Sequence, residues 1–307
     1  MSDSKLSSKG RLSSAAQLFL SEKRAAPSGR SGGNLPQLRA ATRAYIAPAV
    51  ERILRSTNVM TRDVMINRIP CLEVKPLVLT TPWPILYGFG GGFIQGSAFE
   101  DLTIAAPLSS MTGATVIIPS YRLAPENPWP AAIDDGFAVY QTLCDSPFAI
   151  VGESAGGNLA LALMLRAKKA GLSLPRAAAL LSPWCDLDTS SDSQSFNDGR
   201  DPTLTTQDSM IAARLYAGDN DITNPDISPI NGDFDNRFPP FLITTGTRDL
   251  LLSLSVRLAR ILRERGGDVD LQVWEGLWHV FEWEDSLPES NQSIGNIAAF
   301  LLRHVEQ

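Results

Sequence analysis

A serine held between two glycines, in Gly152-Glu153-Ser154-Ala155-Gly156, has the residue types and spacing of a catalytic nucleophile. The pentapeptide follows the short apolar run 148–151 and precedes a helix-like run over 158–170. A serine in a sharp turn between a strand and a helix has a strained backbone, and side chains beside it would collide. The helix directs its N-terminal N–H groups at the serine. The pattern therefore predicts a nucleophile elbow with Ser154 at its tip.

A serine hydroxyl needs a base to take its proton, and the chain has two histidines, His279 and His304. His304 lies in the amphipathic stretch 294–305, which is expected to be the last helix, where a histidine commonly faces solvent or pairs with the helix dipole. His279 follows the strand-like run 269–274 and sits in a turn. We therefore predict His279 as the base; a packed or solvent-facing histidine is the alternative.

The imidazole in turn needs a carboxylate that fixes its tautomer and stabilises its charged form. When the serine sits on such an elbow, the acid comes between the serine and the histidine in the chain. Asp249 follows the strand-like run 241–245 and a turn, which places it at the C-terminal end of a strand. Asp268 and Asp270 begin or lie within the next strand, where a carboxylate more often faces water. Asp249 is the predicted acid, and Glu275 is the alternative.

Three consecutive glycines, Gly90 to Gly92, follow the apolar strand-like run 85–87. Acyl transfer develops negative charge on the carbonyl oxygen, and fixed backbone N–H donors aimed at that oxygen are often the largest catalytic contribution. Consecutive glycines let the backbone approach a substrate closely. The run is therefore predicted to be an oxyanion loop rather than a loop that is merely flexible.

Together these features resemble the hormone-sensitive-lipase-like family of α/β-hydrolases, which includes many bacterial carboxylesterases. The stretch from Tyr121 to Ala132 matches the family's Y-R-L-A-P-E-x-P-x-P-A-A signature. Further segments read like the family: Leu181-Ser182-Pro183-Trp184, Asp186-Leu187, Asp201-Pro202, Ile227-Ser228-Pro229, Pro239-Pro240 and Trp278-His279-Val280-Phe281. The resemblance covers about residues 80 to 305 and is weak over the first 60 or so.

The resemblance implies a fold, an activity and a set of site residues. The fold would be an α/β-hydrolase, a mostly parallel central sheet with helices on both faces and a helical lid. Ser154, Asp249 and His279 would form the catalytic triad. The oxyanion hole would be formed by the main-chain N–H groups of Gly91, Gly92 and Ala155.

One residue departs from the family pattern, because Phe89 stands where the family's H-G-G-G loop motif has histidine. In the family that side chain holds the loop in shape, and the oxyanion donors are backbone groups. We therefore predict that catalysis survives and that packing of Phe89, rather than hydrogen bonding, holds the loop. A second hypothesis is that Phe89 marks specialised chemistry with slow turnover of simple esters.

The expected activity is hydrolysis of small to medium uncharged esters or lactones through an acyl-enzyme on the serine, without a metal or cofactor. Two alternatives stay open: a non-hydrolytic enzyme on this scaffold, such as a lyase, cyclase or acyltransferase, and a ligand receptor. A receptor is disfavoured because His279 is present. Aromatic residues near the predicted site would bind substrate or belong to the core: Phe89, Phe93, Trp184, Trp278 and Phe281.

Composition agrees with an enzyme of this kind. The chain has 307 residues, of which 44% are hydrophobic and 20% charged, as in globular proteins that bury one sizeable core. A net charge of −6 gives no basic surface for nucleic acid. No run approaches the roughly 18 apolar residues of a membrane span, and the start of the chain lacks the apolar core of a signal peptide. A cytoplasmic monomer or homodimer is expected.

The cysteines Cys71, Cys144 and Cys185 are odd in number and lack the spacing of metal ligands, so they are predicted to be buried or partly buried free thiols. Alternating strand and helix patterns from residue 86 onward, with a strand expected over 177–181, favour a parallel sheet covered on both faces. One helical run is expected over 206–217.

Three regions are expected along the chain. Residues 1–60 would form a first lid segment with a disordered start, and residues 61–187 and 237–307 would form the core. The polar insertion 188–236 would form a second lid segment.

Overall fold

An eight-stranded, mostly parallel sheet forms the centre of the protein in a computed structural model that describes residues 12–22 and 34–305. The strand order is β1-β2-β4-β3-β5-β6-β7-β8; β1 pairs antiparallel with β2 and β2 with β4, and the other pairs are parallel. The strands are β1 (Val59–Ile66), β2 (Ile69–Pro76), β3 (Ile85–Gly88), β4 (Val116–Pro119), β5 (Ala149–Glu153), β6 (Ala177–Leu181), β7 (Phe241–Gly246) and β8 (Val269–Trp274).

The central strands explain why the sequence shows short apolar runs rather than alternating ones. Every residue of β3, β5, β6 and β7 is buried, as expected for parallel strands covered on both faces. The edge strand β8 is partly exposed instead.

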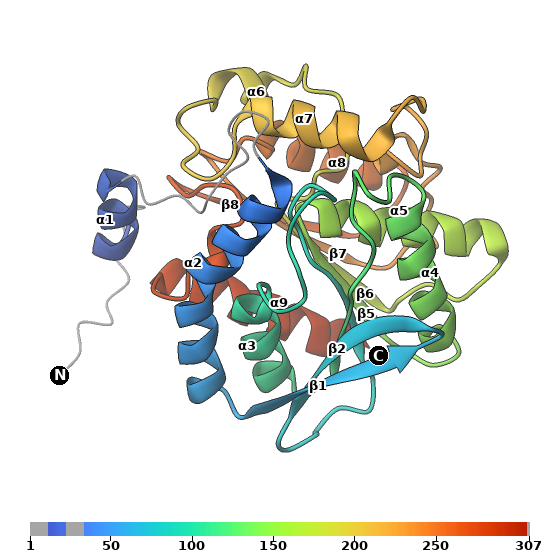
Figure 1. The fold of residues 1–307 in the computed structure, drawn as a ribbon. Helices are drawn as coiled ribbons and strands as arrows, with labels where there is room; N and C mark the ends of the chain where they lie inside the picture. Colours follow the sequence, from blue (N-terminus) through green and yellow to red (C-terminus); the bar gives the residue numbers. More distant parts are fainter. Residues whose placement is uncertain (1–11, 23–33, 306–307) are drawn as a thin grey trace.

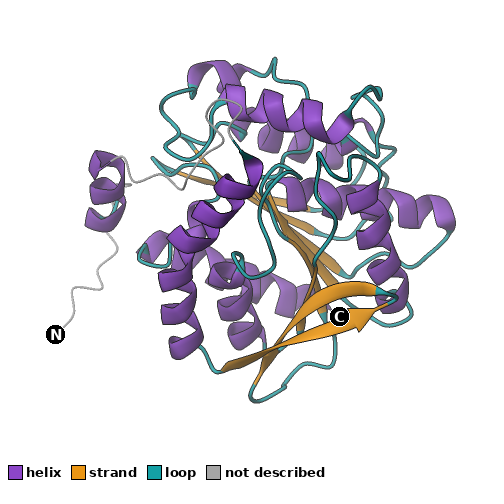
Figure 2. Ribbon diagram, viewed as in Figure 1, coloured by secondary structure: helices purple, strands orange, loops and turns teal. Residues whose placement is uncertain are grey.

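Helices cover both faces of this sheet (Figures 1 and 2). In the view of Figure 1, α3 and α9 lie to one side of the sheet and α4 and α5 to the other. The helices of the described chain are α1 (Ser14–Glu22), α2 (Leu35–Ser56), α3 (Leu102–Thr112), α4 (Ala131–Leu143), α5 (Ala155–Ala170), α6 (Asp192–Phe196), α7 (Thr206–Ala217), α8 (Leu252–Glu264) and α9 (Pro288–Val305), with short 3-10 turns η1 (Pro229–Asn231) and η2 (Phe281–Trp283). The expected α/β-hydrolase architecture is confirmed.

Helix α2 is longer and more continuous than its sequence predicts. The pattern predicts a helix over 38–54 that is kinked or restarted at Pro48, but α2 runs through Pro48 without a break. The Asn34 side chain accepts a hydrogen bond from the Gln37 N–H at its start, which satisfies one of the unpaired donors there. The prediction that the helix restarts at Pro48 is therefore wrong. The predicted disordered start of the chain lies mostly outside the described residues.

The insertion 188–236 contains α6, α7 and η1, and α6 and α7 lie beyond the upper end of the sheet in Figure 1. Helix α7 has the bounds that the sequence predicts, and Thr205 caps it by accepting from the Asp208 N–H. The short helix α6 is not evident from the sequence. A capping box between Ser191 and Gln194 starts it.

The apolar interior consists of one large cluster around the sheet and a smaller one under α1. Helix α1 contributes Ala16 and Phe19 to the smaller cluster, which also contains Leu277, Trp278, Phe281 and Leu287. The N-terminal helix therefore packs against the segment that contains His279.

The three cysteines are buried and free, as the sequence predicts. Burial raises the pKa of the Cys71 thiol to about 11. In the part of the chain that the structure describes, no helix combines the length and apolar character needed to cross a membrane.

Candidate active site

Ser154 occupies a strained turn between β5 and α5. Its φ of 53° and ψ of −116° lie outside the regions that ordinary residues adopt, and a strained residue held by its surroundings is typical of functional sites. A Cβ at Gly152 would overlap the carbonyl oxygen of Gly156, and a Cβ at Gly156 would overlap that of Gly88. The two glycines are therefore required by the close packing of α5 on β3 and β5.

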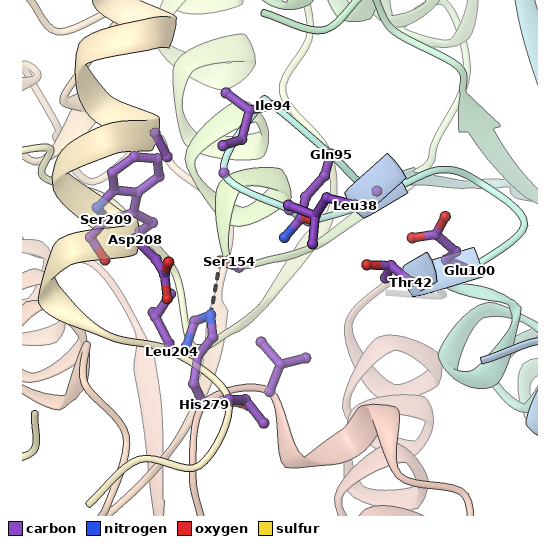
Figure 3. A pocket seen from close by; sticks show the side chains of 18 of the residues that line it. Leu38, Thr42, Ile94, Gln95, Glu100, Ser154, Leu204, Asp208, Ser209 and His279 are labelled. Carbon is purple, nitrogen blue, oxygen red and sulfur yellow. Dashed lines mark hydrogen bonds between the residues drawn. The ribbon is translucent and has the colours of Figure 1, made fainter. Parts of the chain in front are cut away.

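The three predicted triad residues meet although they come from three separate loops. His279 Nε2 lies 2.9 Å from Ser154 Oγ, and His279 Nδ1 lies 3.0 Å from Asp249 Oδ1. The contact between Ser154 and His279 is drawn in Figure 3. Asp249 Oδ2 accepts from the Thr245 hydroxyl at 2.7 Å, and its Oδ1 also accepts from the Leu251 N–H at 2.8 Å. The acid is thus fixed in position from both oxygens.

The electrostatics of this trio favour a charged Asp249 and a basic His279. Burial acts to lower the pKa of His279, but the charge and hydrogen bond of Asp249, together with the charges of Asp201 and Glu282, outweigh it, and the pKa of His279 is raised. Burial acts to raise the pKa of Asp249, but the charge and hydrogen bond of His279 outweigh it, and the pKa of Asp249 is lowered. The alternative acid, Glu275, is exposed on the surface.

Asp201 is a buried acid at this site whose place the sequence does not reveal. Its Oδ2 accepts from the N–H of Leu250 at 2.9 Å and from that of His279 at 3.2 Å. Its Oδ1 accepts from the N–H of Thr203 at 2.9 Å. Burial raises the pKa of Asp201 to about 6. Asp201 therefore joins the insertion to the two loops that present Asp249 and His279.

The glycine loop has the conformation that its sequence requires. Gly91 and Gly92 have φ of +97° and +63°, which side chains rarely permit. The carbonyl of Gly91 accepts from the N–H groups of Ile94 and Gln95 at 3.1 and 3.0 Å, which closes the loop on itself. No described residue accepts a hydrogen bond from the N–H groups of Gly91, Gly92 or Ala155.

Phe89 is packed as predicted, but packing is not the only support of the loop. Its ring stacks on Tyr121 with centroids 4.0 Å apart. The Tyr121 hydroxyl also donates to the Phe89 carbonyl at 2.6 Å. The prediction that Phe89 is held by packing is therefore confirmed. The prediction that no hydrogen bond supports the loop is wrong.

A cavity of about 710 Å³ opens over Ser154 and His279. Figure 3 shows it between α2, which contributes Leu38 and Thr42, and the start of α7, which contributes Asp208. The glycine loop lines it as well. Two segments far apart in the sequence thus wall one cleft over the predicted nucleophile.

The aromatic residues predicted to bind substrate divide into two groups. Trp184 and Trp278 line the cleft. Phe89, Phe93 and Phe281 do not: they are buried elsewhere, and their role in substrate binding is corrected to core packing. Phe89 stacks on Tyr121, Phe93 stacks on Tyr216 at 3.9 Å, and Phe281 packs against Trp274. A position close to the site in sequence therefore does not determine whether an aromatic ring faces the cleft or the core.

Acidic side chains dominate the charged lining of the cleft. Among the described residues that line it, the acidic ones are Glu100, Asp101, Glu153, Asp208 and Glu284, and none is lysine or arginine. Among the described residues, no three His, Cys, Asp or Glu side chains are grouped as metal ligands would be.

Comparisons with known proteins agree with this geometry. Residues 85–283 match a family model described as the α/β-hydrolase fold. A hormone-sensitive lipase from a metagenome library has a solved structure that is 33% identical, with a TM-score of 0.87 over 94% of this chain and 98% of that one.

Two relatives with named activities are also similar. An acetyl-hydrolase from Streptomyces hygroscopicus is 33% identical over 71% of this chain and 74% of its own length. An esterase from Acinetobacter venetianus is 32% identical over 83% of this chain and 87% of its own length. The chain belongs to the hormone-sensitive-lipase-like family of α/β-hydrolases and is a serine carboxylesterase-type hydrolase.

Proposed function

We propose that the protein hydrolyses small to medium uncharged esters, including lactones, through an acyl-enzyme on Ser154. The single observation that carries the proposal is the continuous contact from Asp249 through His279 to Ser154, the last two of which line the cleft. His279 takes the proton from Ser154 as its Oγ attacks the ester carbonyl. His279 then gives that proton to the leaving alcohol, and it next activates the water that hydrolyses the acyl-enzyme.

The negative charge of the tetrahedral intermediate needs donors that are not already used. The N–H groups of Gly91, Gly92 and Ala155 fit this role, because no described residue accepts from them. The Gly91 and Gly92 groups border the cleft, and Ala155 directly follows the nucleophile at the start of α5. Fixed donors of this kind stabilise an oxyanion without reorganising during the reaction.

The substrate preference follows from the lining of the cleft. Acidic side chains border it, and the described lining residues include no lysine or arginine that would neutralise a substrate carboxylate. An ester that carries a free carboxylate would therefore be disfavoured relative to an uncharged ester of the same size. Apolar walls at Leu38, Leu204 and Trp184 suit a modest apolar acyl or alcohol group.

We further propose that residues 1–60 and 188–236 act as lid segments on a core formed by 61–187 and 237–307. This is supported by the positions of Leu38 on α2 and Asp208 on α7, which both line the cleft over the nucleophile. The lid would then decide which esters enter.

The experiment is a series of p-nitrophenyl esters from acetate to decanoate, with Ser154→Ala as the control. Activity that disappears in the control would support the serine mechanism, and the chain-length profile would measure the usable length of the cleft. A fluorophosphonate that failed to label Ser154, together with no activity on any ester, would overturn the proposal.

A further inference from the structure

Two carboxyl groups lie in contact below the glycine loop. Asp101 precedes α3, and Glu153 directly precedes Ser154; their side chains are hydrogen-bonded to each other and are 2% and 6% exposed. Asp101 Oδ2 accepts from the Tyr87 hydroxyl at 3.1 Å, and its Oδ1 accepts from the Trp283 indole N–H at 3.2 Å. Two buried carboxyl groups in contact cannot both ionise readily, so they hold a proton between them.

Glu153 connects this pair to the glycine loop. Its carboxyl group accepts a hydrogen bond from the main-chain N–H of Gly90. A Cβ at Gly90 would overlap that carboxyl group, so the loop backbone lies directly against it. Gly90 immediately precedes Gly91 and Gly92. Any movement of the Glu153 carboxyl is therefore transmitted to the residues proposed to bind the oxyanion.

The proton of the pair is assigned to Glu153. Burial, and then the charge of Asp101, raise the pKa of Glu153 well above its usual range. Burial raises the pKa of Asp101 to about 7, while the donors Tyr87 and Trp283 act to lower it. These donors favour the charge on Asp101, so Glu153 donates its proton to Asp101 and accepts from Gly90 with its carboxyl oxygen.

Among the described residues, none of the side chains that act on the pair carries a positive charge. Tyr87 on β3, Tyr121 after β4, Glu100 in the preceding turn and Glu282 on η2 are the titratable groups that act on it. The Arg43 guanidinium on α2 acts on Glu100. Loss of the shared proton would therefore place two like charges in contact among further acids and phenols.

We propose that Asp101 and Glu153 form a proton-sharing pair that positions the oxyanion loop, as positioning residues for the hydrolysis of esters. This inference rests on the proposed function, because it concerns the donors of Gly91 and Gly92. With one proton present, Glu153 holds Gly90. When that proton is lost, the two carboxylates repel each other, Glu153 leaves Gly90, and the turnover rate falls while substrate binding changes little.

The test compares the pH dependence of kcat in the wild type, Glu153→Gln and Asp101→Asn, with rates in Ser154→Ala subtracted. Both variants keep the size of the side chain, and neither can reach the doubly charged state. We expect kcat of the wild type to fall about tenfold as the pH rises from neutral into the alkaline range, and kcat of both variants to stay flat there. KM is expected to change less than about threefold in each.

A matched control comes from Glu282, a buried carboxyl whose Oε1 accepts from the hydroxyls of Thr244 and Ser293. Glu282→Gln removes an acid near His279 without a contact to the glycine loop, so it should retain the alkaline fall. Glu153→Ala loses the acceptor for Gly90 and should lower kcat about tenfold or more at neutral pH. Rescue of that loss in Glu153→Gln would support positioning by the side chain.

The inference is overturned if the wild type shows no alkaline fall, or if the fall persists unchanged in the amide variants. If only one amide variant folds, that variant decides. If no Ser154-dependent ester hydrolysis is found at any pH, the proposed function fails separately. The pair is then tested by the rate at which a fluorophosphonate labels Ser154. This reaction also develops negative charge on an oxygen, that of the phosphoryl group, and its rate should show the same alkaline fall.

Discussion

The two ring nitrogens of His279 contact different partners, and this fixes which of them carries the proton. Asp249, held ionised, accepts from Nδ1–H, so Nε2 keeps a lone pair that can accept from the Ser154 hydroxyl. The ring is thus in the tautomer that a general base requires. Since the protonated ring cannot act as the base, the acid side of the pH dependence reports on His279.

The first prediction concerns the acid side of that pH dependence. The pKa of His279 is raised above its usual 6.5. Because the protonated ring cannot take the serine proton, kcat/KM should fall as pH decreases through a value above 6.5, with a slope of one on a logarithmic plot. The measurement is kcat/KM for p-nitrophenyl butyrate from about pH 5 to 8. A midpoint below 6.5 would show that burial of the ring outweighs Asp249.

The second prediction decides between the two acids that the sequence leaves open. Asp249→Asn should lower kcat about 10³- to 10⁴-fold, because the amide favours the wrong tautomer of His279 while keeping the shape of the site. Glu275→Gln is the matched control, since Glu275 is exposed, and its kcat should stay within about twofold of the wild type. Comparable losses in both variants would contradict the assignment.

Residue types and their order predict the triad, but not the acids that surround it. Ser154, Asp249 and His279 each follow a strand, and parallel strands bring such loops to one edge of the sheet. Asp101, Glu153 and Asp201 have no such signature. Their chemistry arises from burial and from contacts between distant segments, which the order of residues does not specify.

At the scale of elements, the glycine loop can be tested by its backbone conformation. Gly91→Ala would put a Cβ at φ +97°, where it would overlap the carbonyl oxygen of Gln95. The loop would have to rearrange, and its N–H groups would move from the oxyanion. We expect kcat to fall about 10²- to 10³-fold, measured at saturating ester.

Gly171 supplies the control for this substitution. It also has a left-handed φ, +69°, at the end of α5, and a Cβ there would meet nothing within 4 Å. Gly171→Ala should therefore cost only about 1 kcal/mol of the free energy of unfolding and leave kcat unchanged. An equal loss of kcat in both variants would show that the effect is general destabilisation.

Some elements were predictable to the residue, whereas others were not. The bounds of β6, α7 and β8 agree with the sequence patterns residue for residue. Helix α3 is buried along almost its whole length, so it has no polar face to reveal its period. Strand β2 also escaped prediction. It pairs antiparallel with β4, which lies more than 40 residues away in the chain.

At the scale of the whole molecule, the fold class was predictable and the packing of α1 was not. Helix α1 lies near the start of the chain, yet Phe19 stacks on Trp278 with ring centroids 4.4 Å apart. The Ser13 N–H donates to Glu289 Oε1 at 2.7 Å and fixes the same helix to α9. Trp278 therefore serves as core on one side and as a wall of the cleft on the other.

This arrangement predicts that a change in α1 alters the active site from a distance. Phe19→Ala removes the ring that supports Trp278, the residue before His279. We expect a loss of about 3 kcal/mol in the free energy of unfolding and a decrease in Tm of about 5 °C. We also expect faster hydrogen exchange over both 14–22 and 277–281, with kcat/KM several-fold lower.

Leu18 provides the comparison, because it lies on the same helix but is 53% exposed. Leu18→Ala should change Tm by less than about 2 °C and leave exchange over 277–281 as it is in the wild type, since an exposed side chain stabilises little. If Phe19→Ala accelerated exchange only over 14–22 and kept the wild-type kcat/KM, α1 would be a separately detachable helix. The loop that presents His279 would then be held by the core alone.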